Sequence, residues 1–120
     1  MVRTMTNDQR HLAITEAAAF ADRDAYISDV ARSSVWGDAD AATIPQERIE
    51  ALGAIWDAAH RSIKDIAALA GTSVRQIGLR YGIPRRTIEN WSVGISDPPT
   101  WTLLLLQQAL GLLKHDTRRE

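Results

Sequence analysis

The segment from residue 73 to residue 94, SVRQIGLRYGIPRRTIENWSVG, constrains the fold of this chain more than any other part of it. In its first half, apolar or small residues recur at spacings of three and four, which is typical of one face of an α-helix. These residues are Val74, Ile77, Gly78 and Tyr81. Ser73 is a suitable N-cap for this helix, and Gly82 suits the left-handed position that ends it.

A second helix is expected after a turn of three to four residues. Pro84 fits the entry to this helix, in which Ile88 and Trp91 share the inward face. A helical wheel places on the opposite, exposed face Arg86, Glu89, Asn90 and Val93, flanked by Arg85. The small residue Gly78 would let the two helices cross closely, as a helix-turn-helix requires.

This segment resembles the phage-repressor, Cro-like (XRE) helix-turn-helix family, and the resemblance extends over residues 62–113. The residues that carry it are Gly78, Gly82, Ile88, Asn90, Trp91, Gly94, Pro98, Pro99 and Leu103 to Leu106. The resemblance implies an all-α fold, a lambda-repressor-like bundle, with additional N-terminal helices in this chain. Val74 departs from the family, which often has glutamine there, and so does Val93, where a charged residue is common. Fewer phosphate contacts are therefore expected.

The resemblance also implies that the helix 85–93 enters the major groove of double-stranded DNA, with Arg85, Arg86 and Asn90 as base readers. Such roles agree with the chemistry, because arginine can form two hydrogen bonds to guanine and asparagine two to adenine. Glu89 either accepts a hydrogen bond from cytosine or holds Arg85 or Arg86 in place, since it follows them by four and three residues. We favour the second role for Glu89.

Phosphate contacts are expected mainly from the helix before the turn, which in this family crosses the DNA backbone. Arg75 and Arg80 are its cations, and they would position the module without reading sequence. Ser73 and Thr87 are further candidates for phosphate binding, although Thr87 alternatively packs against its neighbours.

Charge divides unevenly along the chain. Residues 1–60 hold 5 basic and 10 acidic residues, a balance of −5, whereas residues 61–120 hold 9 and 5, a balance of +4. Residues 73–94 contain four arginines and one glutamate, so the net charge of this segment is +3. So small a charge predicts weak, salt-dependent non-specific binding. A homodimer would double the contacts and read two half-sites about one helical turn apart.

A helix over Trp101–Leu113 carries more leucines than one small domain can bury on one side. One stripe is formed by Leu103, Leu106, Leu110 and Leu113, and the leucines off this stripe are Leu104, Leu105 and Leu112. The second side should face either the N-terminal half or another subunit, because exposed apolar patches are unusual. The run is too short, and too interrupted by glutamines, to span a membrane.

The N-terminal half has enough large apolar residues to fold. Helices are expected over about Asn7–Ala21, about Arg23–Val35 and Gln46–His60, with a break at Gly37–Pro45. The last of these helices has an apolar face formed by Ile49, Leu52, Trp56 and Ala59. We expect this face to pack on the helix-turn-helix core, where it would replace the fifth helix usual in the family.

These expectations divide the chain into three parts: an acidic N-terminal helical extension over residues 1–45, a Cro-like domain over residues 46–113 and a C-terminal tail over residues 114–120. The extension could brace the domain, dimerise or bind a protein partner. Its negative charge argues against contact with DNA.

Other chemistry is not indicated. His11, His60 and His115 lack metal-ligand spacing, and the chain has no cysteine, so we expect no metal, no cofactor and no enzyme activity. The absence of a secretory pattern in the first 20 residues, together with the lack of cysteine, favours a cytoplasmic location.

The sequence therefore predicts a sequence-specific DNA-binding transcriptional regulator, a repressor, that acts as a homodimer. The alternative is a protein-binding antitoxin or phage-type inhibitor. In that alternative the acidic N-terminal half would engage a protein, and the helix-turn-helix would be a scaffold or autoregulator.

Overall fold

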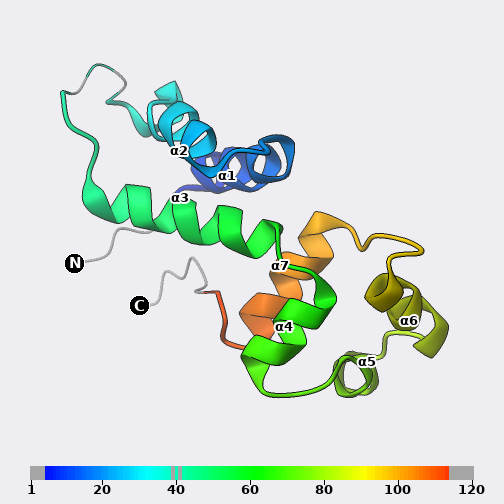
Figure 1. The fold of residues 1–120 in the computed structure, drawn as a ribbon. Coiled ribbons are helices and arrows are strands. Elements are labelled where there is room, and N and C mark those ends of the chain that lie inside the picture. The colour runs from blue at the N-terminus through cyan, green and yellow to red at the C-terminus, as the bar shows by residue number, and fades with distance from the viewer. Residues whose placement is uncertain (1–4, 39, 41, 114–120) are drawn as a thin grey trace. The chain divides into compact units, whose positions relative to one another are not determined.

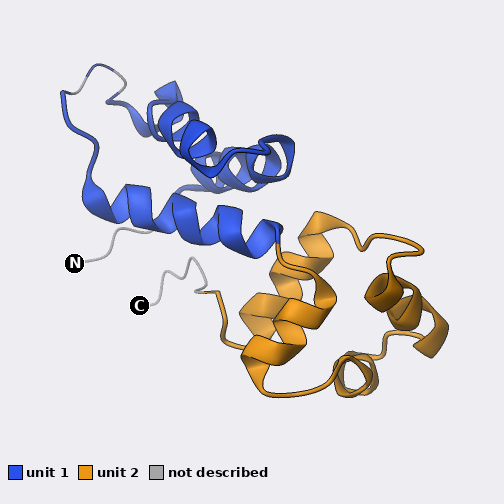
Figure 2. Ribbon diagram, in the orientation of Figure 1, with its two compact units in different colours: residues 1–60, 115–120 blue, residues 61–114 orange. Residues whose placement is uncertain are grey.

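The fold was determined as a computed structural model, which describes residues 5–38, 40 and 42–113. The described residues form seven α-helices and one short 3-10 helix, with no strand (Figure 1). The predicted all-α class is therefore confirmed. The chain divides into two compact units, which meet in sequence between residues 60 and 61 and are coloured separately in Figure 2.

Unit 1 contains three α-helices and the 3-10 helix. They are α1 (Asn7–Ala19), α2 (Arg23–Ala31), η1 (Ser34–Trp36) and α3 (Gln46–Ala59). Helices α1 and α2 both begin with a side-chain cap: the Thr6 hydroxyl accepts a hydrogen bond from the backbone N–H of Gln9, and the Asp22 carboxylate accepts one from Ala25. These caps satisfy backbone donors that a helix leaves unpaired at its start.

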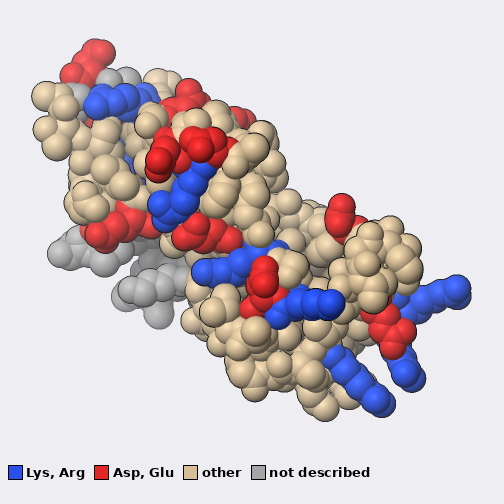
Figure 3. Space-filling view, in the orientation of Figure 1, with Lys and Arg blue, Asp and Glu red and all other residues tan. Residues whose placement is uncertain are grey.

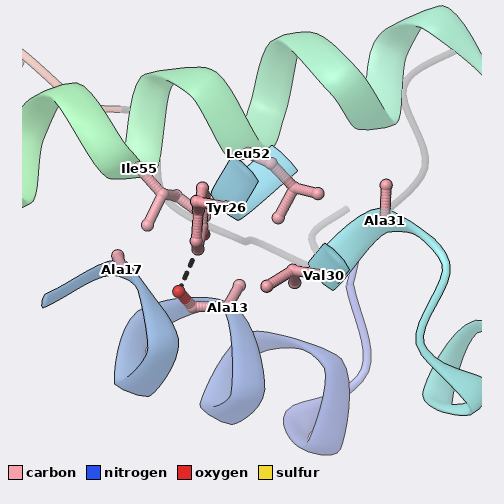
Figure 4. Close-up of a cluster of buried hydrophobic side chains, with 7 residues drawn as sticks. All are labelled: Ala13, Ala17, Tyr26, Val30, Ala31, Leu52 and Ile55. Carbon is pink, nitrogen blue, oxygen red and sulfur yellow. Dashed lines mark hydrogen bonds between the residues drawn. The ribbon is translucent and has the colours of Figure 1, made fainter. Parts of the chain in front are cut away.

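The core of unit 1 combines small alanines with a few large side chains (Figure 4). Its buried members are Ala13, Ala17, Tyr26, Val30, Ala31, Leu52 and Ile55. Ala13 and Ala17 keep α1 thin on its inner side, and the large Tyr26 side chain packs there. The Tyr26 hydroxyl is buried and donates a 2.8 Å hydrogen bond to the carbonyl oxygen of Ala13, shown as the dashed line in Figure 4.

The apolar face of α3 packs on α1 and α2. The prediction that this face packs on the helix-turn-helix core was therefore wrong. Leu52 and Ile55 belong to the core of unit 1, and the Trp56 indole N–H donates a 3.0 Å hydrogen bond to the carbonyl oxygen of Phe20, just after α1. The units therefore divide after residue 60, whereas the sequence placed the boundary after residue 45. An amphipathic pattern shows that a face is buried, but not which element covers it.

Unit 2 contains four α-helices: α4 (Ile63–Ala70), α5 (Val74–Tyr81), α6 (Arg85–Val93) and α7 (Thr100–Ala109). Its core is rich in isoleucine and leucine, with buried members Ile63, Ile66, Ala67, Ile77, Ile88, Leu103 and Leu106. The Arg61 guanidinium donates a 2.9 Å hydrogen bond to the fully buried side-chain oxygen of Gln107. This bond joins the start of α4 to α7.

Helices α2 and α7 end several residues earlier than the sequence predicted. Helix α2 ends at Ala31 instead of near Val35, because the Ser33 hydroxyl accepts a hydrogen bond from the Val35 N–H and starts η1. Helix α7 ends at Ala109 instead of Leu113, because Gly111 adopts a left-handed φ of 80° and closes the helix. The predicted tail over residues 114–120 lies outside the described residues.

The leucines of α7 are divided between buried and exposed positions. Leu103 and Leu106 lie in the core of unit 2, and Leu110 packs against it. Leu104 is also buried, whereas Leu105 is 55% exposed. No helix within the described residues has both the length and the apolar character needed to cross a membrane.

Candidate functional site

Helices α5 and α6 are joined by the turn Gly82 to Pro84, and their ends match the sequence predictions. The Ser73 hydroxyl accepts a hydrogen bond from the backbone N–H of Gln76 and thereby caps α5. Gly82 has a left-handed φ of 71°, and the Ile83 N–H donates a 2.9 Å hydrogen bond back to the carbonyl oxygen of Gly78. This is the closure by which a glycine ends a helix and reverses the chain.

Gly78 lets the two helices approach closely. It is buried, and a Cβ placed on it would lie 3.2 Å from the Ile88 Cγ2 atom and 3.5 Å from the Ile83 carbonyl oxygen. A side chain larger than a methyl group would therefore displace α6 from α5. The small residue predicted at this crossing is needed for the geometry observed.

The two faces of α6 differ in burial as the wheel predicted. Ile88 is 2% exposed and lies in the core, whereas Arg85, Arg86 and Glu89 are exposed and Asn90 is half-buried. Arg85 Nε donates a 2.9 Å hydrogen bond to Glu89 Oε2, so Glu89 holds Arg85 rather than Arg86. Within the described part of the chain, neither Arg86 nor the Asn90 side-chain amide has a polar partner.

A cleft of about 560 Å³ lies between α5 and α6. Four of the predicted site residues line it, namely Arg75 from α5 and Arg85, Glu89 and Asn90 from α6. The structure thus brings one predicted phosphate-binding arginine to the same cleft as three predicted base-reading residues. Cationic, anionic and amide groups therefore line one cleft.

The other predicted site residues do not line this cleft. Arg86 is exposed on α6, and the Arg80 guanidinium lies 5.4 Å from the ring centroid of Tyr81, on α5. Ser73 is exposed and engaged in capping, and Thr87 is half-buried.

The start of α6 is not arranged for helix stability. Arg85 and Arg86 occupy its first turn, where the positive end of the helix dipole disfavours cations, and the N-cap Pro84 supplies no side-chain acceptor. In contrast, α4 begins with a reciprocal capping box between Ser62 and Asp65. Positions that violate a local rule without a packing reason are often functional.

Three exposed apolar side chains accompany these polar groups, and sequence reasoning did not single them out as a set. Leu79 is 67% exposed, Val93 is 66% exposed and Ile95 is 74% exposed. Leu79 and Val93 also line the cleft. The exposure of Leu79 could have been predicted from the sequence, because this residue lies off the apolar stripe of α5.

The described residues include two of the three histidines. His11 and His60 are both exposed, and the His60 ring stacks on Trp56 with 3.9 Å between centroids. His115 lies outside the described residues. No group of three or more histidine, aspartate or glutamate side chains in the described ranges is arranged to hold a metal ion.

Comparisons with protein-family models, curated proteins and solved structures found no match to this chain.

Proposed function

We propose that this protein is a sequence-specific DNA-binding regulator in which α5 and α6 form a helix-turn-helix and α6 reads the major groove. In this proposal Arg85, Arg86 and Asn90 contact base edges, and Arg75 and Arg80 contact phosphates. The observation that carries the proposal is the composition of α6, whose buried face holds Ile88 while its opposite face presents two arginines and an amide. An α-helix with such a face has the size and the donors that the major groove accepts.

The uneven charge of the molecule supports this proposal. On the face drawn in Figure 3, acidic side chains gather over unit 1, and basic side chains project from unit 2. Residues 61–113 contain six basic and three acidic residues. The phosphate backbone attracts such a module and repels unit 1.

A homodimer is part of the proposal, because one module of net charge +3 neutralises few phosphates. Trp101 is 63% exposed and Leu105 is 55% exposed, and they lie one helical turn apart on α7. These side chains are candidates for the contact between two copies. We further propose that the dimer acts as a repressor in the cytoplasm.

The proposal is tested by selection from a randomised duplex library with the full-length protein, followed by fluorescence anisotropy on the enriched duplex and a scrambled one. We expect a preference for the enriched duplex at physiological salt. Arg86→Ala should reduce binding to the enriched duplex by about 1–3 kcal/mol and relax the preference at one base pair.

Lys64→Ala is the matched control, because it also removes one exposed positive charge but changes α4. Lys64→Ala should reduce the affinity for both duplexes equally and leave the preference for the enriched duplex intact. Equal losses on every duplex with Arg86→Ala would contradict base reading by this residue.

One observation favours the alternative, a protein-binding antitoxin or inhibitor that works through unit 1. Residues 1–60 contain ten acidic and five basic residues, a balance of −5. A basic protein partner would complement such a surface. Weak binding of all duplexes, together with a stable complex through residues 1–60, would establish this alternative instead.

A further inference from the structure

The ion pair between Arg85 and Glu89 lies on the exposed face of α6, where packing does not impose it. Their side chains are 75% and 59% exposed, and 2.9 Å separates Arg85 Nε from Glu89 Oε2. Within the described residues, neither Nη1 nor Nη2 of Arg85 has a hydrogen-bond partner. The pair therefore determines how the arginine side chain is held while leaving the end of the guanidinium available.

Helix stability does not account for this pair. The arginine precedes the glutamate by four residues, which is the less favourable order for such a pair, and it occupies the first turn of α6. Exposed pairs of this kind contribute little to folding. The consequence of the contact is the orientation of Arg85.

We propose that Glu89 is a positioning residue that holds Arg85 toward one guanine of the DNA site, and that Glu89 itself selects no base. This inference depends on the DNA-binding function proposed above. With Nε engaged, Nη1 and Nη2 form a fork of two parallel donors. Guanine is the base that offers two acceptors, O6 and N7, on its major-groove edge.

The Glu89 carboxylate also disfavours contact between Arg85 and a DNA phosphate. A phosphate near the guanidinium would be repelled by Glu89, whereas the uncharged edge of a base would not. Adenine presents one donor and one acceptor on this edge and therefore opposes one arm of the fork. Arg86 has no such carboxylate partner among the described residues and is available to contact phosphate or base.

A positioning role for Glu89 and direct base reading by Glu89 predict different results when the carboxylate is removed. Removing the carboxylate should weaken discrimination at the guanine read by Arg85, because the fork is no longer held. The same change should strengthen non-specific binding by roughly two- to fivefold, since a negative charge facing DNA is lost. A cytosine reader would instead lose discrimination at a different base pair.

The test uses the full-length protein and its enriched duplex, with every base pair of one half-site substituted in turn and with 7-deazaguanine in place of each guanine. For the wild type we expect one guanine at which loss of N7 reduces affinity roughly five- to hundredfold, and Arg85→Ala should abolish that effect. Glu89→Gln should reduce the effect severalfold at the same guanine. The double variant Arg85→Ala/Glu89→Gln should discriminate this guanine to the same extent as Arg85→Ala alone, because both residues act through one contact.

Glu89→Asp separates charge from geometry. It keeps the negative charge but shortens the side chain, so non-specific affinity should stay at the wild-type value while discrimination falls. Circular dichroism and thermal unfolding should be unchanged in these variants, since both side chains are exposed.

Unchanged guanine discrimination in Glu89→Gln would overturn the inference, and so would a loss confined to a base pair that Arg85→Ala does not affect. In both results the wild type still prefers its enriched duplex, so the proposed function stands. Absence of any preference in the wild type would overturn the function and the inference together.

Discussion

The arginines of the two units are used in different ways. In unit 1, the Arg48 side chain is only 10% exposed and forms two hydrogen bonds to the Asp38 carboxylate, at 2.9 Å and 2.7 Å. It also donates to the Ala31 carbonyl oxygen at the end of α2, and its guanidinium lies 4.4 Å from the centroid of the Trp36 ring. In unit 2, Arg85 is 75% exposed, and its partner within the described residues is Glu89 on the same helix.

This difference indicates which charges hold the fold and which are available to a ligand. Arg23 on α2 reaches Asp57 on α3 at 2.9 Å, so it joins two helices, as Arg48 does. Among the described residues, no arginine of α5 or α6 bonds to another helix, and unit 2 is held by its isoleucine-rich core and by the bond from Arg61 to Gln107. Removing Arg23 or Arg48 should therefore affect the folding of unit 1, whereas removing an arginine of α5 or α6 should affect binding.

The largest expected effects come from truncating one core at a time. Ile88→Ala and Leu52→Ala each remove a buried side chain and should lower the free energy of unfolding by about 2–5 kcal/mol. Hydrogen exchange should show the loss of protection mainly in unit 2 for Ile88→Ala and mainly in unit 1 for Leu52→Ala. Equal loss in both units from either variant would mean that the two cores unfold as one.

Arg48→Ala and Arg86→Ala compare the two kinds of arginine directly. We expect Arg48→Ala to lower the free energy of unfolding by about 1–3 kcal/mol, because a largely buried carboxylate contact and a carbonyl bond are lost. Arg86→Ala should change it by less than about 0.5 kcal/mol, since that side chain is exposed. Urea unfolding measures both, and similar losses would remove the distinction between the units.

Arg48→Lys serves as a control for charge in this comparison. Lysine keeps the positive charge but lacks the planar fork that contacts Asp38 twice. Its stability should lie between those of the wild type and Arg48→Ala.

Tyr26→Phe tests the polar contact within the core of unit 1. Loss of the hydrogen bond to Ala13 should cost about 1 kcal/mol at pH 8. Burial, aided by the charge of Glu16, raises the pKa of Tyr26 above its ordinary value. The unfolded chain therefore releases this proton first, and the wild type should lose up to about 1.4 kcal/mol per pH unit above pH 10.

The phenylalanine variant lacks that titration. Its stability deficit, measured by urea unfolding from pH 8 to pH 11, should shrink as the pH rises. A deficit that stays constant would show that Tyr26 ionises equally in the folded and unfolded chains.

The last prediction concerns turn glycines, one in each unit. Gly82→Ala and Gly37→Ala place a side chain at φ values of 71° and 77°, with open space around the added methyl group. Each should cost about 1 kcal/mol from backbone strain alone. Asparagine at position 82 should cost less, because it tolerates the left-handed region. Thermal unfolding checks these values, and a much larger loss at Gly82 would reveal contacts that the open space does not explain.

Local features of unit 2 were predictable because neighbouring residues determine them. The Ser73 cap, the Gly82 turn and the buried Ile88 were all assigned correctly. Of the candidate site, the exposed face of α6 follows from helical spacing, and so does a pairing of Glu89 with Arg85 or Arg86, since these contacts lie within one helix. The structure selects Arg85. The cleft shared by Arg75 and Asn90 could not be predicted, because it depends on how two helices cross.

In unit 1, too, contacts between helices could not be predicted from the sequence. The sequence by itself determined that α3 has one apolar face and that the chain is helical, because periodicity and capping act over a few residues. Only the tertiary structure decided that this face packs on α1 and α2, and that Arg48 reaches both Asp38 and Ala31. Apolar burial is not directional, so a stripe such as that of Leu52 and Ile55 fits any complementary surface until packing selects one.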